Sequence, residues 1–308
     1  MRGLSTKQLA QFEKDGYLVL RRLVSQRDVS MLVDRVASLV AAFDPKSSDS
    51  VFDSERQRSK GMTFDPHEDR YFLESGDCTR FFWEADAFDE GTGELTRAKE
   101  LCLNKIGHAL HYEDPVVRNI VARNFRPVAM SLFKDPRPLQ SMYIFKQPEI
   151  GGAVTPHQDS TFLYTEPESC IGSWLALHPA RKNNGCLYVV PGSHKNESIG
   201  LSQRYLRSTK PGEYRTYFEP AEVAPLPTEP SVALEADPGD VVLLHGRVVH
   251  FSAANTSDVP RHSFTVHTIE GGAHYPRDNW LQNRDGSPFA PFPTEADSPL
   301  PADYVAPL

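Results

Sequence analysis

The chain has 308 residues and a formal net charge of -8 at pH 7, with 39% hydrophobic and 24% charged residues. This balance is typical of a globular protein and argues against nucleic acid or an anionic membrane surface as a partner. The four cysteines form no Cys-x-x-Cys pair, and neither a signal peptide nor an apolar run of about eighteen residues is found, so we expect a cytoplasmic protein.

The N-terminal part is predicted to be helical with one early strand. Ser5 and Gln8 have the spacing of a capping box, and Gly16 can end the first helix. A strand is expected in YLVLRRLV, residues 17–24. Ser25 then opens an amphipathic helix. Its apolar face holds Val29, Leu32, Val33, Val36, Leu39 and Val40.

The next segment, residues 45–70, is polar and has no periodicity, so we expect a surface loop or a lid that can move. Residues 96–125 return to helical spacing, and Asp114-Pro115 is expected to separate two helices. Two histidines of this helical stretch could border a pocket, although packing is the more ordinary role: His108 and His111.

From residue 136 onward, short runs rich in Val, Ile, Tyr and Phe alternate with clusters of Gly, Pro, Asn and Asp, as in GCLYVVPGSH. This alternation of short apolar runs and turn-forming residues is typical of an all-β barrel or sandwich. We expect one domain over residues 1–308. It would consist of a mostly helical support and lid region (1–135), a barrel core (136–280) and an irregular, proline-rich tail (281–308).

A metal site is suggested by PHQDS, in which His157 and Asp159 are separated by one residue. On a strand these two side chains would project from the same face, while Gln158 would face away. A third ligand is available in DVVLLHGRVVHFS. His250 is the better candidate there, because His245 would point to the opposite face of a straight strand. Two histidines and one carboxylate are the ligand set of non-haem Fe(II) oxygenases.

Two residues that follow His250 in the chain favour binding of a dicarboxylate. Ser252 lies two residues further on, and Arg261 opens the strand RHSFTVH. A buried guanidinium can hold a carboxylate through two parallel hydrogen bonds, and 2-oxoglutarate carries such a group at its far end. The remaining histidines of the barrel region are expected to be structural: His178, His194, His262, His267 and His274.

The motifs HQD, GCLYVVPGSH and PGDVVLLHGRVVHFS, followed by an arginine, resemble the phytanoyl-CoA dioxygenase family of Fe(II)/2-oxoglutarate oxygenases. The resemblance extends from the first helix to Trp280. It implies a mainly β fold, the double-stranded β-helix or jelly-roll barrel, with N-terminal and flanking α-helices. It also implies that His157, Asp159 and His250 hold iron and are catalytic. Arg261 and Ser252 would hold the distal carboxylate of 2-oxoglutarate.

Similarity to a narrower group within the family implies three further residues that bind the cosubstrate: Lys105, Met142 and Trp174. Without the resemblance, Lys105 would be taken as a solvated helix residue, and Met142 and Trp174 as core. Two aromatic residues beyond the metal motif are expected to shape the substrate side of the pocket: Phe162 and Tyr164.

The function implied by the resemblance is that of a dioxygenase that uses Fe(II), 2-oxoglutarate and O2 to hydroxylate or otherwise oxidise a C–H bond, releasing succinate and CO2. Halogenating relatives carry a small residue in place of Asp159, so its carboxylate favours oxidation. The small-molecule substrate could be an acyl-CoA, a free acid or a natural-product intermediate. The alternatives are a cupin-like metal enzyme that is not an oxygenase and a non-catalytic binding protein.

A basic run, RYLRSTKPGEYR, could bind a polyanion such as the phosphates of coenzyme A, although runs of charge are usually solvated loops. Its cationic residues are Arg204, Arg207, Lys210 and Arg215. The sequence does not predict an oligomeric state.

Overall fold

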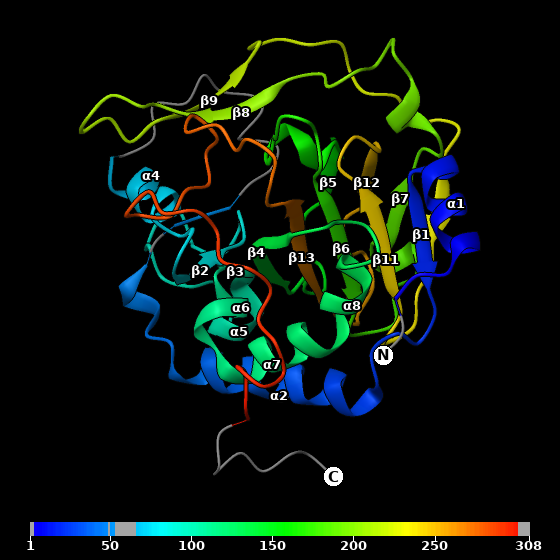
Figure 1. Ribbon diagram of the computed structural model, residues 1–308. Coiled ribbons are helices and arrows are strands. Elements are labelled where there is room, and N and C mark those ends of the chain that lie inside the picture. The colour runs from blue at the N-terminus through cyan, green and yellow to red at the C-terminus, as the bar shows by residue number, and fades with distance from the viewer. Residues whose placement is uncertain (1–2, 49, 53–65, 301–308) are drawn as a thin grey trace.

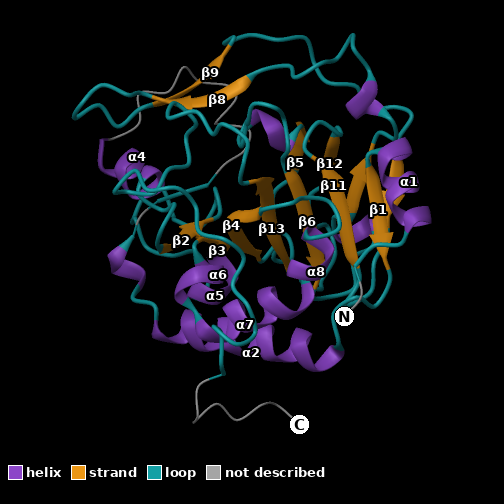
Figure 2. Cartoon of the chain, viewed as in Figure 1, coloured by secondary structure: helices purple, strands orange, loops and turns teal. Residues whose placement is uncertain are grey.

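The computed structural model of the protein describes residues 3–48, 50–52 and 66–300. Its centre is a pair of antiparallel β-sheets that face each other, and helices cover the outside of the larger sheet (Figure 1, Figure 2). The expected mainly β, double-stranded β-helix fold is therefore confirmed. No helix in the described part of the chain is both long and apolar enough to cross a membrane.

The larger sheet carries most of the hydrophobic core. In sheet order its strands are β1 (Tyr17–Leu20), β11 (Val241–His245), β6 (Ile171–Ala176), β13 (Ser263–Glu270), β4 (Pro136–Ile144), β3 (Leu103–His108) and β2 (Thr79–Trp83). Every residue of β6 and nearly every residue of β11 and β13 is buried. In β11, burial on both faces fits the continuous apolar run VVLL, whereas β13 alternates apolar residues with Thr265 and His267.

The smaller sheet provides the opposite wall. Its strands, in order, are β10 (Val232–Leu234), β7 (Leu187–Val189), β12 (His250–Ser252) and β5 (Val154–His157). In the register of β12 and β5, His250 lies directly opposite His157. A separate hairpin of β8 (Arg204–Arg207) and β9 (Thr216–Glu219) lies above one end of the barrel (Figure 1).

The first two helices begin where local capping signals predict them. Helix α1 (Thr6–Asp15) has the Ser5/Gln8 capping box and ends at Gly16, whose φ of 79° is left-handed. Helix α2 (Gln26–Ala42) starts after Ser25, and its apolar face packs below the large sheet (Figure 1). The shorter helices are α4 (Pro66–Leu73), α5 (Lys99–Cys102), α6 (Leu110–Glu113), α7 (Pro115–Asn124) and α8 (Arg126–Ala129).

One predicted helical stretch is partly wrong. The boundary at Asp114 is confirmed, since its side chain accepts hydrogen bonds from the first N–H groups of α7. Residues 103–108, however, form β3, which pairs with both β2 and β4. Such a short segment has little helical stability of its own, so two neighbouring strands that complete its hydrogen bonds decide its conformation. Lys105 and His108 therefore lie on a strand.

The segment predicted as a loop or lid, residues 45–70, is described only in part. Pro45–Ser47 forms a single 3-10 turn, and Pro66–Leu73 forms α4, so the prediction of a loop up to residue 70 is wrong at its C-terminal end. Residues 53–65 lie outside the described residues. The part of the tail after Trp280 that the structure describes is irregular, as expected.

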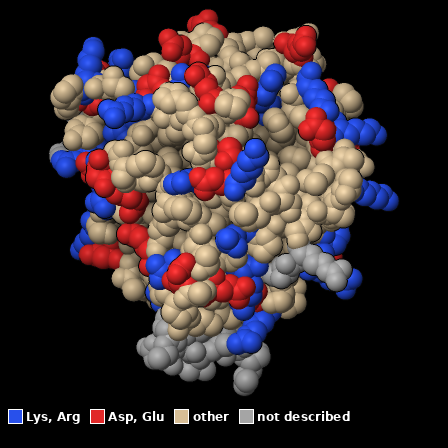
Figure 3. Space-filling view, viewed as in Figure 1, with Lys and Arg blue, Asp and Glu red and all other residues tan. Residues whose placement is uncertain are grey.

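Surface charge follows the mixed composition of the chain. On the face shown in Figure 3, acidic and basic side chains are interspersed over the whole surface, and neither sign forms a continuous area.

Candidate active site

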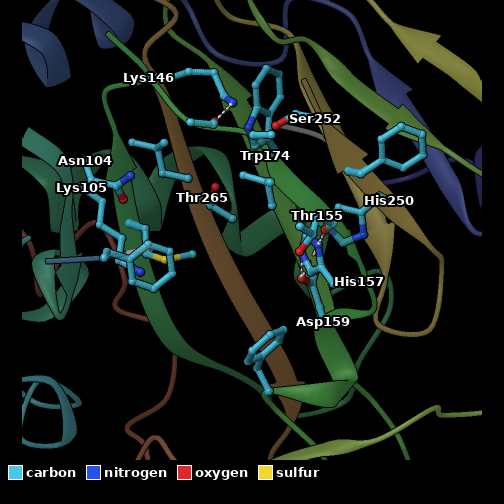
Figure 4. Close-up of a pocket in the computed structure, with 18 of the residues that line it drawn as sticks. Asn104, Lys105, Lys146, Thr155, His157, Asp159, Trp174, His250, Ser252 and Thr265 are labelled. Atoms are coloured by element: carbon cyan, nitrogen blue, oxygen red, sulfur yellow. Dashed lines mark hydrogen bonds and ion pairs between the residues drawn. The ribbon is translucent and has the colours of Figure 1, made fainter. Parts of the chain in front are cut away.

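The three predicted metal ligands come together between the two sheets (Figure 4). His157 is the last residue of β5 and His250 is the first residue of β12. The sequence predicted that Asp159 lies on the same strand as His157. In the structure Asp159 instead opens a 3-10 turn over Asp159–Thr161. Gln158 faces away, and its amide donates to the carbonyl groups of Gly200 and Arg247.

The geometry of these ligands fits a divalent metal ion. Asp159 Oδ1 lies 3.6 Å from Nε2 of both His157 and His250, and the potential ligand atoms lie within 4.8 Å of one another. Each histidine places Nδ1 against a carbonyl oxygen, at 2.8 Å from Thr155 and 3.1 Å from Val248 respectively. Nδ1 therefore carries the proton, and the Nε2 lone pairs are available to an ion beside the carboxylate.

The second oxygen of Asp159 faces a histidine from the opposite sheet. Nε2 of His267 lies 3.2 Å from Asp159 Oδ2, although the N–H is poorly aligned for a hydrogen bond. Nδ1 of His267 lies 3.1 Å from the amide nitrogen of Gln140. The amide donates to Nδ1, so the proton on Nε2 points toward the carboxylate. His267 was expected to be structural, and sequence analysis missed this contact.

The electrostatic surroundings keep Asp159 ionised. Burial raises the pKa of this carboxyl group, but His267, His250 and His157 together lower it well below its usual range. A carboxylate that stays charged is a ligand for a divalent cation at any physiological pH.

Gly172 on β6 provides the space for the pair of Asp159 and His267. A Cβ at this position would lie 2.7 Å from Asp159 Oδ2 and 3.4 Å from His267 Nε2.

We expect Gly172→Ala to displace the carboxylate and to weaken Fe(II) binding by about 10–100-fold, as loss of an outer contact does in other metal sites. Anaerobic Fe(II) titration measures this effect. Gly272→Ala is the control, since a Cβ there would make only an ordinary contact, 3.9 Å from Glu270 Oε1, near the end of β13. Equal affinities for the two variants would contradict the prediction.

Arg261 lies in the same cavity and has no carboxylate partner in the described part of the chain. It is only 2% exposed, its Nη1 donates to Ser263 Oγ at 2.7 Å, and its guanidinium lies 5.5 Å from the ring centre of Trp174. Burial lowers the pKa of Arg261 to about 10, so the group is still cationic at neutral pH. A buried cation without an anion is costly to the folded protein, which makes this position a natural site for an anionic ligand.

Lys146 fixes the surroundings of Arg261 and was not predicted from the sequence. Its backbone has a positive φ of 35°, which is unusual for a residue with a side chain. Its Nζ donates to the carbonyl oxygens of Gly152 at 2.6 Å and Ala253 at 2.8 Å. Its own carbonyl accepts from the N–H of Arg261 at 3.2 Å. Lys146 thus ties Arg261 to the segment that directly follows Ser252.

Three strands of the large sheet line the cavity beside Arg261. Thr265 on β13 is the register partner of both Met142 on β4 and Trp174 on β6, so these residues form one row across the sheet. Thr265 and Trp174 are labelled in Figure 4. The Thr265 hydroxyl is buried and has no partner in the described structure. Lys105 on β3 is 5% exposed rather than solvated, and its Nζ lies 3.1 Å from the centre of the Phe52 ring.

Glu84 also lines the cavity and responds to pH. Burial raises its pKa from 4.5 to about 7, while Asn104, Lys146 and the Gly152 N–H act in the opposite direction and Asp86 adds to the rise. The folded state therefore holds this proton more tightly than the unfolded chain. The resulting stabilisation is complete below about pH 4.5 and is lost as the pH rises through about 7.

We expect the wild type to lose about 1–3 kcal/mol of unfolding free energy relative to Glu84→Gln between pH 5 and pH 8. Urea unfolding at each pH measures the difference. Glu149→Gln, on an exposed side chain, is the control. A difference between wild type and Glu84→Gln that does not change with pH would contradict the prediction.

A single cavity of about 600 Å³ is lined by all eight residues singled out for the metal and cosubstrate. They are Lys105, Met142, His157, Asp159, Trp174, His250, Ser252 and Arg261. His108 also lines it, whereas His111 packs elsewhere against Ser141. His245 does not join the metal ligands and instead packs beside His194, with ring centres 4.9 Å apart.

Of the two aromatic residues expected to shape the substrate side of the pocket, one lines the cavity and the other does not. Phe162 lines the cavity, but Tyr164 does not. Its ring stacks with the guanidinium of Arg204 at 4.7 Å, and its hydroxyl donates to Glu166. The expectation that Tyr164 shapes the pocket is therefore wrong, because the chain turns after the 3-10 turn of Asp159–Thr161 and directs this ring outward.

The basic run is held by partners within the protein. Arg204 pairs with Asp278 at 2.7 Å, and the guanidinium of Arg207 donates to the Leu73 carbonyl. The other two cations, Lys210 and Arg215, both face Glu213. These contacts favour a charged surface loop whose cations pair within the protein over a binding site for a polyanion.

The fold and the site together define a class. Two histidines and one carboxylate at the inner wall of a jelly-roll barrel, beside a buried arginine, are the arrangement expected of a non-haem iron oxygenase. The phytanoyl-CoA dioxygenase (PhyH) family matches residues 12–263. The chain belongs to this family, and the family resemblance and the dioxygenase class inferred from the sequence are confirmed.

Relatives and solved structures agree with this membership. Phytanoyl-CoA dioxygenase 1 of Oryza sativa subsp. japonica is 43% identical, covering 92% of this chain and 95% of its own. Phytanoyl-CoA dioxygenase domain-containing protein 1 of Mus musculus is 40% identical, covering 95% and 99%. The structure of EctD from S. alaskensis with bound Fe has a TM-score of 0.62 at 20% identity, covering 95% and 88%. The carbocyclase SnoK from nogalamycin biosynthesis has a TM-score of 0.59 at 20% identity, covering 94% and 93%.

Proposed function

We propose that the protein is an Fe(II)- and 2-oxoglutarate-dependent dioxygenase that oxidises a C–H bond of a small organic substrate. The observation that carries the proposal is the buried Arg261, which has no carboxylate partner among the described residues and lies in the same cavity as the His157, Asp159 and His250 cluster. A metal site alone would suit many enzymes. A metal site together with a buried cation suits a cosubstrate that has a metal-binding end and a distal carboxylate.

When bound, ferrous iron supplies the redox chemistry that couples decarboxylation of 2-oxoglutarate by O2 to oxidation of the substrate. His157, Asp159 and His250 would hold the ion and leave the other side of its coordination sphere open. Arg261 would grip the distal carboxylate, and the Ser252 and Thr265 hydroxyl groups are the neutral donors beside it.

The other residues would orient and enclose the cosubstrate. Met142 and Trp174 would pack against its carbon chain. Lys105 would offer an amine donor at the side of the cavity opposite β12, where burial holds the pKa of this group well below its ordinary value. Lys146 is a positioning residue, since it acts through Arg261 and through the segment after Ser252. Arg261 and Trp174 are buried, so little water reaches this part of the cavity. The lower dielectric constant there strengthens the attraction between Arg261 and a bound carboxylate.

The experiment that tests the proposal is anaerobic calorimetry of Fe(II)-loaded protein with 2-oxoglutarate, followed by admission of O2 and measurement of succinate and CO2. We expect binding and release of the two products in equal amounts. Failure of the metal-loaded protein to bind 2-oxoglutarate would favour a cupin-like enzyme that is not an oxygenase. Binding without any release of succinate would favour a non-catalytic binding protein.

The substrate class and location are also part of the proposal. The names of the rice and mouse relatives contain phytanoyl-CoA, which makes an acyl-CoA one candidate beside free acids and natural-product intermediates. The four cysteines are all free thiols, which supports a reducing compartment such as the cytoplasm.

A further inference from the structure

The cavity has an aromatic side that the metal and cosubstrate residues do not use. A series of ring contacts leads away from the His157 ring, beginning with Phe162 at 6.0 Å between ring centres. Phe162 contacts Tyr205 at 5.6 Å, and the Tyr205 ring lies 6.3 Å from Trp280. We call five of the rings that line the cavity the aromatic wall: Phe72, Phe162, Tyr205, Phe218 and Trp280.

The aromatic wall is pre-formed by its own packing. Phe72 and Trp280 are stacked, with ring centres 4.3 Å apart and planes at 11°, and Tyr205 and Phe218 lie 4.7 Å apart. The Tyr205 hydroxyl donates to Thr216 at 2.7 Å, which fixes the ring under the hairpin of β8 and β9. A set of fixed faces and edges favours another flat ring, since ring pairs gain about 0.5–1.5 kcal/mol beyond their buried area.

Besides the Thr265 hydroxyl, two neutral polar groups in the cavity lining lack a hydrogen-bond partner within the described residues. One is the indole N–H of Trp280, a residue only 4% exposed, and the other is the side-chain oxygen of Gln140, which is 4% exposed. A buried donor or acceptor that stays unpaired is costly, so a ligand is expected to supply the missing partner. A carbonyl, ether or hydroxyl oxygen would satisfy the Trp280 donor.

The lysine and arginine side chains of the cavity lining have their described contacts outside the aromatic wall. Among the described lining residues, the lysine and arginine side chains are Lys105, Lys146 and Arg261. Lys105 and Arg261 lie over rings outside the aromatic wall, and Lys146 is bonded to backbone carbonyls. Arg204 and Arg207, on the neighbouring β8, are held by Asp278 and by the Leu73 carbonyl. A carboxylate or phosphate placed against the aromatic wall would lose its hydration without gaining a described cation.

We infer that the aromatic wall is the substrate site, and that the part of the substrate bound there is an uncharged ring system with an oxygen acceptor for the Trp280 N–H. This inference rests on the proposed function and narrows its substrate class. The wall begins at the ring of His157, so a substrate that covers it presents its C–H bonds to the metal ligands. It selects neutral ring compounds over free acids and over acyl chains.

The test uses Fe(II)-loaded protein with 2-oxoglutarate and four matched probes: tetralone, tetralin, tetralin carboxylate and decanoyl-CoA. Equilibrium dialysis without O2 measures binding, and succinate release with O2 measures stimulated turnover. We expect tetralone to bind about 10-fold more tightly than tetralin, because it pairs the indole donor. We expect both to bind more tightly than the two anionic probes, and both to stimulate succinate release.

A pair of tryptophan variants assigns the preference to one atom. Trp280→Phe keeps a ring and removes the N–H, so the preference for tetralone over tetralin is expected to disappear. Trp83→Phe is the matched control, since Trp83 is buried outside the cavity and its Nε1 already donates to the Ser48 carbonyl at 2.7 Å. The ratio of two affinities does not depend on how much of a variant is folded.

The outcomes separate this inference from the proposed function. Tighter binding of either anionic probe, no binding of the neutral rings, or a tetralone preference that persists in Trp280→Phe would overturn the substrate class while 2-oxoglutarate still binds. Failure of the wild type to bind 2-oxoglutarate would overturn the function itself.

Discussion

Replacement of Asp159 by alanine is expected to abolish turnover of 2-oxoglutarate, with a loss of at least about 1,000-fold in succinate release. Asp159 contributes the only carboxylate among the metal ligands, and its two oxygens face two different groups. One lies 3.6 Å from Nε2 of both ligand histidines, and the other lies 3.2 Å from His267. Its loss leaves three imidazoles, two of them buried, without a negative charge to balance an incoming cation.

Two measurements check this effect. Fe(II) titration gives the metal affinity of each variant, and succinate release at saturating Fe(II) gives its turnover. Asp237→Ala is the control, since the Asp237 side chain is exposed and its described ion pair is with Arg181. If Asp159→Ala binds Fe(II) as tightly as wild type and still releases succinate, the ligand assignment is wrong. His157→Ala and His250→Ala are expected to follow Asp159→Ala.

The features predicted well from the sequence are those that depend on nearby residues. Ser5, Ser25 and Asp114 each satisfy free N–H groups within three residues, so a short window contains both partners of the hydrogen bond. β3 was missed because its partners, β2 and β4, come from elsewhere in the chain. A window around Lys105 contains the apolar spacing of a helix and does not contain the strands that override it.

In the site, too, residues close together in the sequence were predicted, and contacts between distant segments were not. His157 and Asp159 were found because one residue separates them, although the turn that presents Asp159 was not. His267 was missed because its contact with Asp159 joins the end of β5 to β13, more than one hundred residues later. Lys146 was missed because its role depends on carbonyl oxygens, and no sequence motif records where a backbone carbonyl points.

Arg261 provides the second large effect. Arg261→Gln removes a buried cation that would pair with the distal carboxylate of 2-oxoglutarate, so we expect the KM for 2-oxoglutarate to rise by at least about 100-fold. Arg261→Lys keeps the charge but loses the planar fork, and an increase of about 10–100-fold is expected. Pyruvate has the same metal-binding end without the distal carboxylate. The preference for 2-oxoglutarate over pyruvate should therefore shrink in Arg261→Gln and survive in the control Arg137→Gln.

A purely structural arginine would behave differently, and stability distinguishes the two roles. Breaking a buried ion pair by removing one partner typically costs about 3–5 kcal/mol, because the other charge is left alone. Arg261 has no such partner among the described residues, and its side-chain hydrogen bond within the described structure is to the neutral hydroxyl of Ser263. Arg261→Gln should therefore unfold, in the absence of 2-oxoglutarate, at a temperature no lower than wild type. Wild type should gain thermal stability from 2-oxoglutarate, and the variant should lose that gain. A strongly destabilised variant that still responds to 2-oxoglutarate would show that Arg261 supports the barrel and that another residue holds the cosubstrate.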